Sequence, residues 1–140
     1  MTIVISLGGS IIVPKEVDYK FLKEFKKTIL SVKNKKIVIC TGGGFTARDY
    51  IQALRKEKLN DYTQDLIGIE VTRLNAKLVA SFIRKCNQEI PTTLEQVKEL
   101  LQTHKSYFER RSDSSVHCLS FCHQEPERLR TRLVFYHGYS

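Results

Sequence analysis

Two short apolar runs, each ending in a glycine-rich turn, constrain this chain more than any other feature of its sequence. Residues 3–7 read Ile-Val-Ile-Ser-Leu and lead into Gly-Gly-Ser, and residues 37–40 read Ile-Val-Ile-Cys and lead, after Thr41, into three consecutive glycines at 42–44. Short runs that are rich in β-branched residues and almost continuously apolar are typical of strands covered on both faces. The glycines predict a tight turn at the carboxyl end of each strand.

Amphipathic helices are expected between and after these two runs. Asp18 is suited to cap the first helix, and the apolar residues of this helix and the later ones recur mostly at spacings of three and four. These residues are Leu22, Phe25, Ile29 and Val32; Tyr50, Ile51 and Leu54; Ile67, Val71, Leu74, Leu78 and Phe82; and, after a start near Thr92 or Thr93, Leu94, Val97 and Leu101. The order strand, helix, strand, helix, helix predicts an α/β fold with a parallel sheet.

The composition suits one folded domain, or part of one, in water. The chain has 140 residues, 41% of them hydrophobic and 27% charged, and a formal net charge of +8. These values exclude disordered and collagen-like chains. No apolar run approaches the roughly 20 residues that cross a bilayer, and no basic segment or cleavage site marks a leader. We therefore expect a cytoplasmic protein with no membrane partner and with reduced cysteines.

The composition changes sharply near residue 102. All twelve Ile lie before this point, whereas all four His and six of the ten Ser lie after it. We therefore divide the chain into a partial domain, residues 1–102, and a tail of unmatched composition, residues 103–140. The tail is interpreted as the non-native end of a truncated or frame-shifted chain, and a separate binding or regulatory module or chance variation are the alternatives.

The tail also lacks the strand that an α/β domain should place after the helix near residue 92. We expect the sheet to end there and the tail to be irregular, with residues 133–136 as a strand that has no evident partner.

Two further patterns in the tail have functional and structural interpretations. Four possible zinc ligands, His117, Cys118, Cys122 and His123, fall within seven residues. Zinc sites usually draw ligand pairs from two separated places, so a short loop is a poor candidate. Arg128, Arg130 and Arg132 alternate near two aromatic residues, which fits either a nucleic-acid-binding strip or a solvated strand face.

The two glycine turns carry the functional signal of the first segment. Ligands of open α/β sheets bind at the carboxyl ends of the strands, and glycine lets backbone N–H groups approach an anion closely. Arg48, one helical turn after the triple glycine, is placed to bind a phosphate with two nitrogens. Neither turn is a Walker A loop or a complete Rossmann fingerprint. The alternative is that the glycines serve only the tight strand-to-helix turns.

Two polar residues lie on the expected long helix. Asp65 is either a first-turn acid favoured by the helix dipole or an acceptor for the hydroxyl or ring N–H groups of a bound sugar or base. Asn75 is assigned no chemistry, because an amide inside a helix is commonly a satisfied polar group at a packing seam.

Three blocks of residues 1–102 resemble the archaeal-type uridylate kinases of the amino-acid kinase fold. They read Ile-Ser-Leu-Gly-Gly-Ser at 5–10, Thr-Gly-Gly-Gly-Phe-Thr-Ala-Arg-Asp-Tyr-Ile at 41–51, and Asp-Leu-Ile-Gly-Ile-Glu-Val-Thr-Arg-Leu-Asn-Ala at 65–76. The second and third blocks are specific to that group, and the first is shared by the whole superfamily. The resemblance implies a parallel-sheet amino-acid kinase fold, of which only the amino-terminal half is present.

The same resemblance implies an activity, cofactors and site residues. Members transfer the γ-phosphoryl group of ATP to UMP and give UDP for pyrimidine nucleotide synthesis, with Mg²⁺ and commonly as a hexamer. By resemblance, the ATP-binding residues are Gly9, Ser10, Gly44 and Arg48, and the UMP-binding residues are Gly43 and Asp65. No catalytic side chain and no metal ligand is assigned.

The chain departs from this family in three respects. Ser6 stands where many superfamily members have Lys, and the family chain is much longer. After residue 102 the sequence has neither the Gly-Gly-x-x-Pro-Gly turn nor the Thr-Asn-Val-Asp-Gly stretch of the family. We therefore expect marginal stability and weak or absent kinase activity. The alternative from another class is a non-catalytic nucleotide- or RNA-binding protein, although we do not expect nucleic acid as a partner.

Overall fold

The computed structural model describes residues 2–84, 86, 87, 89–103, 115–120 and 132–136. Within these residues, parallel strands form one sheet in the order β3-β2-β1-β4. The strands are β1 (Thr2–Leu7), β2 (Lys36–Thr41), β3 (Ser115–Ser120) and β4 (Arg132–Tyr136). The helices are α1 (Gly9–Ile12), α2 (Tyr19–Ser31), α3 (Gly44–Lys56), α4 (Asp61–Ile83) and α5 (Leu94–Thr103). The predicted α/β fold with a parallel sheet is confirmed.

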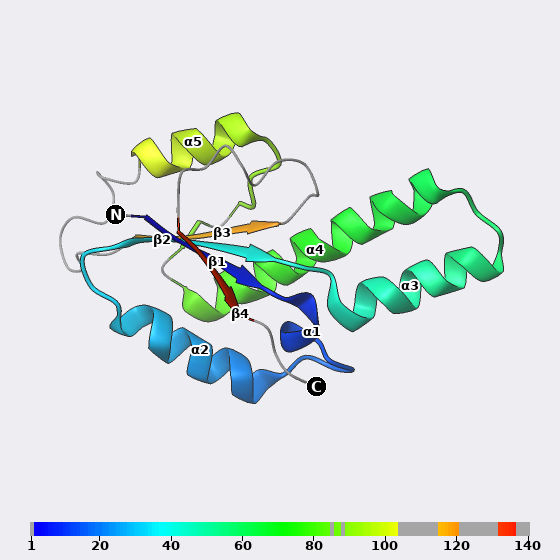
Figure 1. Cartoon of the computed structure of the whole chain (residues 1–140), viewed down its shortest axis with the longest axis horizontal. Coiled ribbons are helices and arrows are strands. Elements are labelled where there is room, and N and C mark those ends of the chain that lie inside the picture. Colours follow the sequence, from blue (N-terminus) through cyan, green and yellow to red (C-terminus); the bar gives the residue numbers. More distant parts are fainter. Residues whose placement is uncertain (1, 85, 88, 104–114, 121–131, 137–140) are drawn as a thin grey trace.

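Helices cover both faces of the sheet, as Figure 1 shows. On one face Ile5 and Leu7 of β1 pack with α2 and with the second half of α4. On the other face Val4 and Val38 pack against Val97 of α5. Because successive strand residues point to opposite faces, a strand buried on both sides must be apolar throughout. This is why β1 and β2 could be recognised from short apolar runs.

The helix starts follow the local sequence. The carboxylate of Asp18 accepts a hydrogen bond from the backbone N–H of Phe21 at 2.8 Å, so the predicted cap of α2 is confirmed. The side chain of Asn60 caps α4 by accepting from the N–H of Thr63 at 2.9 Å. The interpretation of Asp65 as a first-turn acid is wrong, because α4 begins one turn earlier and its first-turn acid is Asp61.

The prediction that the sheet ends without a further strand is wrong. β3 pairs in parallel with β2, and β4, which includes the predicted strand at 133–136, pairs in parallel with β1. A strand joins a sheet through backbone hydrogen bonds, so its pairing partner is not encoded in its composition. The rest of the tail, residues 104–114, 121–131 and 137–140, lies outside the described residues.

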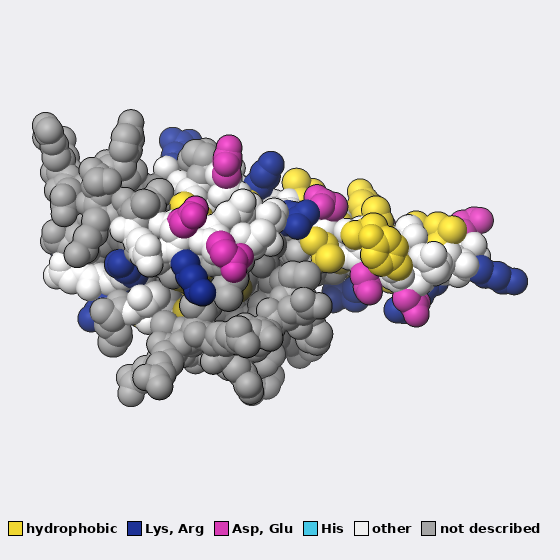
Figure 2. Space-filling model, turned by 90° about the horizontal axis from the view of Figure 1, so that it is seen from above, with side chains coloured by type: hydrophobic (Ala, Val, Ile, Leu, Met, Phe, Trp, Pro, Cys, Tyr) yellow, Lys and Arg dark blue, Asp and Glu magenta, His cyan; other side chains and the backbone are white. Residues whose placement is uncertain are grey.

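Helix α3 and the first half of α4, residues 44–70, form an antiparallel arm that extends away from the sheet (Figure 1). Figure 2 shows hydrophobic side chains gathered on this α3–α4 arm. Its exposed large hydrophobic residues are Phe45, Tyr50, Leu59, Tyr62 and Leu66. Among the helices of the described part, none combines the length and the apolar character that a membrane span needs.

Candidate functional site

The two glycine turns start at the same edge of the sheet and touch each other. Leu7 and Thr41, the last residues of β1 and β2, are register partners. A Cβ atom built on Gly9 would lie 2.1 Å from the backbone nitrogen of Gly44 and 2.6 Å from the carbonyl carbon of Gly42. The two turns therefore meet backbone to backbone, at the carboxyl ends of parallel strands, where sheets of this class bind their ligands.

Hydrogen bonds hold the two turns together. The N–H of Gly42 donates to the carbonyl of Leu7 at 3.3 Å, and the N–H of Phe45 donates to the carbonyl of Val13 at 3.0 Å. Each bond joins the segment after β2 to the segment around the first turn. The backbone amides of the two turns thus keep a fixed spacing before any ligand arrives, which is the preorganisation that an anion site requires.

Helix α4 supports the second turn from its other side. The side-chain amide of Asn75 donates to the carbonyl of Gly42 at 2.8 Å and to that of Gly43 at 3.1 Å. The hydroxyl of Thr41 donates to the carbonyl of Thr72 at 3.1 Å. Asn75 and Thr41 are both buried. The sequence did not reveal this role of Asn75, because its partners lie more than thirty positions away.

The glycines of the two turns differ in what the backbone demands of them. Gly44 has a φ of +63° and lies against the carbonyl of Gly9, so a side chain there is both strained and blocked. Gly9 is blocked by the contact with Gly44 described above. At Gly8, by contrast, an added Cβ would meet only the side chain of Ile11, at 3.8 Å. The fold therefore explains Gly9 and Gly44, but it does not require glycine at position 8.

The electrostatics of this edge favour an anion. Helix α3 begins at Gly44, and the first N–H groups of a helix have no partner within the helix and carry the positive end of its dipole. The first turn of α3 contains no acidic residue. Arg48, one turn into α3, is exposed and makes no ion pair or hydrogen bond with another described residue. The site can therefore hold a phosphate through backbone amides, with the exposed guanidinium of Arg48 one helical turn away.

Of the other predicted site residues, Ser10 lies next to the contact between the two glycine turns, and Asp65 lies farther away. Ser10 is exposed in the first turn of α1. Asp65 is exposed on α4, seven residues before Thr72 and so roughly 10 Å from it along the helix. Thr72 is next to Gly43, since its Cγ2 lies 3.7 Å from a Cβ built there. The structure thus brings Gly9, Ser10, Gly43 and Gly44 together and places Asp65 on the arm.

Cys40, the last but one residue of β2, is no nucleophile. Burial raises the pKa of its thiol from 9.0 to about 11. A thiol with this pKa stays protonated at neutral pH, and the thiolate is the reactive form. Within the described residues, no three His, Cys, Asp or Glu side chains gather as a metal site would require. The side chains of the possible zinc ligands at 117, 118, 122 and 123 lie outside the described residues.

Comparison with known proteins gives one family. The model of the amino acid kinase family matches residues 1–117 of this chain, which is fifteen residues beyond the division at 102. The uridylate kinase of Thermoplasma volcanium is 44% identical over 104 residues, which are 74% of this chain and 46% of that protein. The uridylate kinase of Methanococcoides burtonii is 38% identical over 107 residues, which are 75% of this chain and 45% of that protein.

A solved structure agrees with these matches. The crystal structure of the uridylate kinase from Archaeoglobus fulgidus superposes with a TM-score of 0.69 at 32% sequence identity. The superposition covers 86% of this chain and 51% of that one. The chain spans about half the length of the relatives it matches.

Proposed function

Because this chain belongs to the amino acid kinase family, we propose that it forms the phosphate-binding half of a uridylate kinase, which transfers the γ-phosphoryl group of ATP to UMP. The proposal rests on one observation, the backbone contact between the glycine turns at 8–10 and 42–44. Phosphoryl transfer needs little covalent chemistry from the protein. The protein must hold ATP and the acceptor nucleotide in line, and it must direct hydrogen-bond donors at the negative charge that develops on the transferred phosphoryl group.

The proposed roles follow the two turns. Gly9 and Ser10 approach the ATP phosphates after β1, Gly44 and Arg48 lie on the ATP side of the second turn, and Gly43 contacts UMP. Asp65 accepts hydrogen bonds from the uridine end of UMP. A nucleotide carries its phosphate and its base at opposite ends, so one UMP molecule can extend from the second turn along α4 toward Asp65.

Mg²⁺ is proposed as the companion of ATP. This ion is usually held by substrate phosphates and waters together with one or two carboxylates, and a dedicated protein cage is uncommon. Phosphates gathered by the glycine turns suit that form of binding, and the ion would supply charge neutralisation there. That the chain contributes no metal ligand of its own stays a prediction.

The setting of the protein is also part of the proposal. We expect a cytoplasmic homo-oligomer, a hexamer if it follows the family, and the exposed apolar residues of the α3–α4 arm supply a surface for a second copy. The division into a domain of 102 residues and a tail also remains a proposal.

The proposal is tested by measuring nucleotide binding and transfer separately. Isothermal titration of the whole chain with UMP and with ATP should show saturable binding of each. Transfer, followed as UDP formation by chromatography with ATP and Mg²⁺, should be weak, because the sequence has neither of the two later family motifs. A folded chain that binds neither nucleotide would overturn the proposal. A chain that transfers at the rate of its longer relatives would overturn only the prediction of weak activity.

A further inference from the structure

Arg73 of α4 has a guanidinium group that the fold uses only in part. One Nη nitrogen forms an ion pair with the carboxylate of Glu70, one turn earlier in the same helix. The Nε atom is buried and has no hydrogen-bond partner among the residues the structure describes. The side chain of Arg73 is 33% exposed and that of Glu70 is 66% exposed. Since Nε is sealed, the exposed part of the arginine consists of its other atoms.

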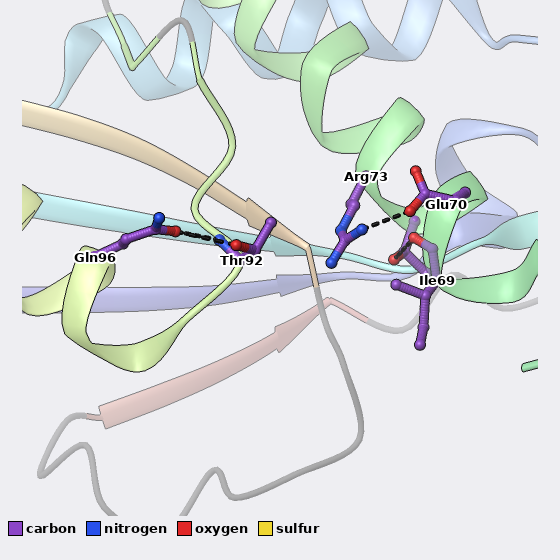
Figure 3. A network of polar contacts seen from close by, with 6 residues as sticks. Ile69, Glu70, Arg73, Thr92 and Gln96 are labelled. Carbon is purple, nitrogen blue, oxygen red and sulfur yellow. Dashed lines mark hydrogen bonds and ion pairs between the residues drawn. The ribbon is translucent and has the colours of Figure 1, made fainter. Parts of the chain in front are cut away.

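The position of Arg73 follows from its neighbours. The preceding residue, Thr72, accepts a hydrogen bond through its carbonyl from Thr41 at the carboxyl end of β2. Thr41 is the register partner of Ser120 at the carboxyl end of β3. Helix α4 packs against β3. Figure 3 shows the Arg73 side chain leaving α4 beside the tip of β3, at the carboxyl ends of the strands.

From this placement we propose that Arg73 binds the phosphate group of the acceptor nucleotide, an inference that rests on the proposed function. A guanidinium has five N–H donors in a planar fork that matches the oxygens of a phosphate. Glu70 occupies one corner of the fork and fixes its direction, and the Nη donors that Glu70 does not engage are available to an anion.

The strand order indicates the acceptor and not the donor. The turn assigned to the ATP phosphates follows β1, and β3 lies on the far side of β2 from β1. Arg73 stands over the ends of β2 and β3, so the second glycine turn separates it from the first. Asp65, proposed to hold uridine, lies on the same helix. A cation here would also reduce the repulsion between two anionic nucleotides.

The test compares UMP with uridine, which differ only by the phosphate. Binding of both is measured by isothermal titration to the whole chain and to Arg73→Gln. We expect UMP to bind more tightly than uridine to the parent chain. Arg73→Gln should weaken the binding of UMP at least tenfold and leave the binding of uridine unchanged. Arg73→Lys keeps the charge but loses the planar fork, so it should lose less affinity for UMP than Arg73→Gln and none for uridine. If Arg73→Gln does not fold, Arg73→Lys provides the test.

Glu70→Gln separates ligand binding from a structural role. If Arg73 acts only through its ion pair with Glu70, then Glu70→Gln and Arg73→Gln should weaken the binding of UMP equally. If Arg73 binds phosphate, Glu70→Gln removes a competing negative charge, and UMP should bind as well as to the parent or better.

The outcomes keep this inference distinct from the proposed function. Where the parent binds UMP but Arg73→Gln leaves the ratio of UMP to uridine affinity unchanged, Arg73 has no such role and the proposed function stands. Where the parent binds neither UMP nor ATP, the proposed function fails. Titration of the parent and of Arg73→Gln with inorganic phosphate then tests whether Arg73 binds an anion. Saturable phosphate binding that Arg73→Gln abolishes would then support an anion site, and its absence would overturn the inference.

Discussion

At the scale of single residues, the glycines at this sheet edge fall into those that the fold needs and those that it does not. Gly9 and Gly44 occupy the space in which the two turns touch, and no side chain fits between two backbones at that separation. Gly8 has ordinary φ and ψ angles of −57° and 133°, and an added Cβ would make only ordinary van der Waals contact with the side chain of Ile11. Sequence alone treats these glycines alike. Their separate roles suggest substitutions that divide stability from ligand binding.

Gly9→Ala should destabilise the chain, and Gly8→Ala should not. The new methyl group of Gly9→Ala would lie 2.1 Å from the nitrogen of Gly44, so the turns must move apart, at a cost of about 2 kcal/mol or more. Gly8→Ala should change the free energy of unfolding by less than about 0.5 kcal/mol, yet weaken ATP binding by crowding the amides of the first turn. Urea denaturation and ATP titration of both variants measure this. Equal stability losses would show that the turn contact is not as close as described.

Asn75→Asp should be costly despite its nearly identical shape. Asn75 is 3% exposed, and its Nδ2 donates to the carbonyls of both Gly42 and Gly43. A carboxylate there cannot donate and would face two carbonyl oxygens, so we expect a loss of roughly 2 to 3 kcal/mol. Glu24→Gln, at the exposed ion pair with Lys27, is the control and should change stability by less than about 0.5 kcal/mol. Denaturant midpoints compare them, and an unchanged midpoint for Asn75→Asp would rule out the support role.

The buried thiol of Cys40 should make the folded chain less stable at alkaline pH. Its thiol ionises near pH 9.0 in the unfolded chain, whereas burial raises its pKa to about 11 in the folded one. Above pH 9 the unfolded chain releases a proton that the folded chain retains, so stability falls as the pH rises from 9 to 11, by about 1 to 2 kcal/mol. Cys40→Ala should lack this part of the decline. Denaturation at several pH values shows it as a difference in slope, and parallel curves would contradict the buried thiol.

The residue scale also shows where sequence reasoning stops. The glycine turns could be predicted because strand ends and glycine have local signatures, and their contact followed from the parallel sheet. The role of Asn75 could not be predicted, because its hydrogen bonds reach the turn after β2 from the middle of α4. Arg73 was read only as part of a family block, since burial of one nitrogen is a property of packing.

At the scale of elements, the strands and helices with strong local patterns were predicted, β4 was predicted as a strand without a pairing partner, and β3 was not predicted. β1 and β2 are almost continuously apolar, with Ile3–Ile5 and Ile37–Ile39 as their apolar centres, because both faces are covered. β3 and β4 differ, because their place in the sheet depends on backbone pairing with β2 and β1. The short helix α1 was missed for a related reason. It consists of only four residues after a glycine turn, too few for a periodic pattern.

The cap of α2 gives a prediction at this scale. Asp18→Ala removes the acceptor for the N–H of Phe21 and should destabilise the chain by about 1 kcal/mol, because α2 packs Leu22 and Phe25 into the core. Asp18→Asn keeps an acceptor oxygen and should stay within a few tenths of a kcal/mol of the parent. Thermal and urea unfolding compare the two. A loss as large in Asp18→Asn would mean that charge, and not the capping hydrogen bond, matters at this position.

At the scale of the whole molecule, net charge alone does not separate the two classes of function that the sequence left open. The net charge of +8 suits attraction of nucleotides and also of RNA. Geometry distinguishes them, since the proposed site, built on two glycine turns in contact, is compact and would take only a few phosphates. An extended polyanion instead engages many cations along its length. The two kinds of complex therefore differ in how steeply their affinity falls with salt.

Salt dependence of binding is the measurement that exploits this difference. For single-stranded RNA, log K falls against log salt with a slope of about −0.7 for each phosphate contacted, so a basic surface that engages six phosphates gives a slope near −4. UMP brings one phosphate to the site, and its slope should be no steeper than about −1. Filter binding of a mixed-sequence RNA and titration with UMP, over the same range of salt, supply both slopes. Tight RNA binding with a steep slope, together with no binding of UMP, would favour the non-catalytic alternative. A shallow slope for UMP with only weak RNA binding would mean that the positive charge serves a nucleotide site.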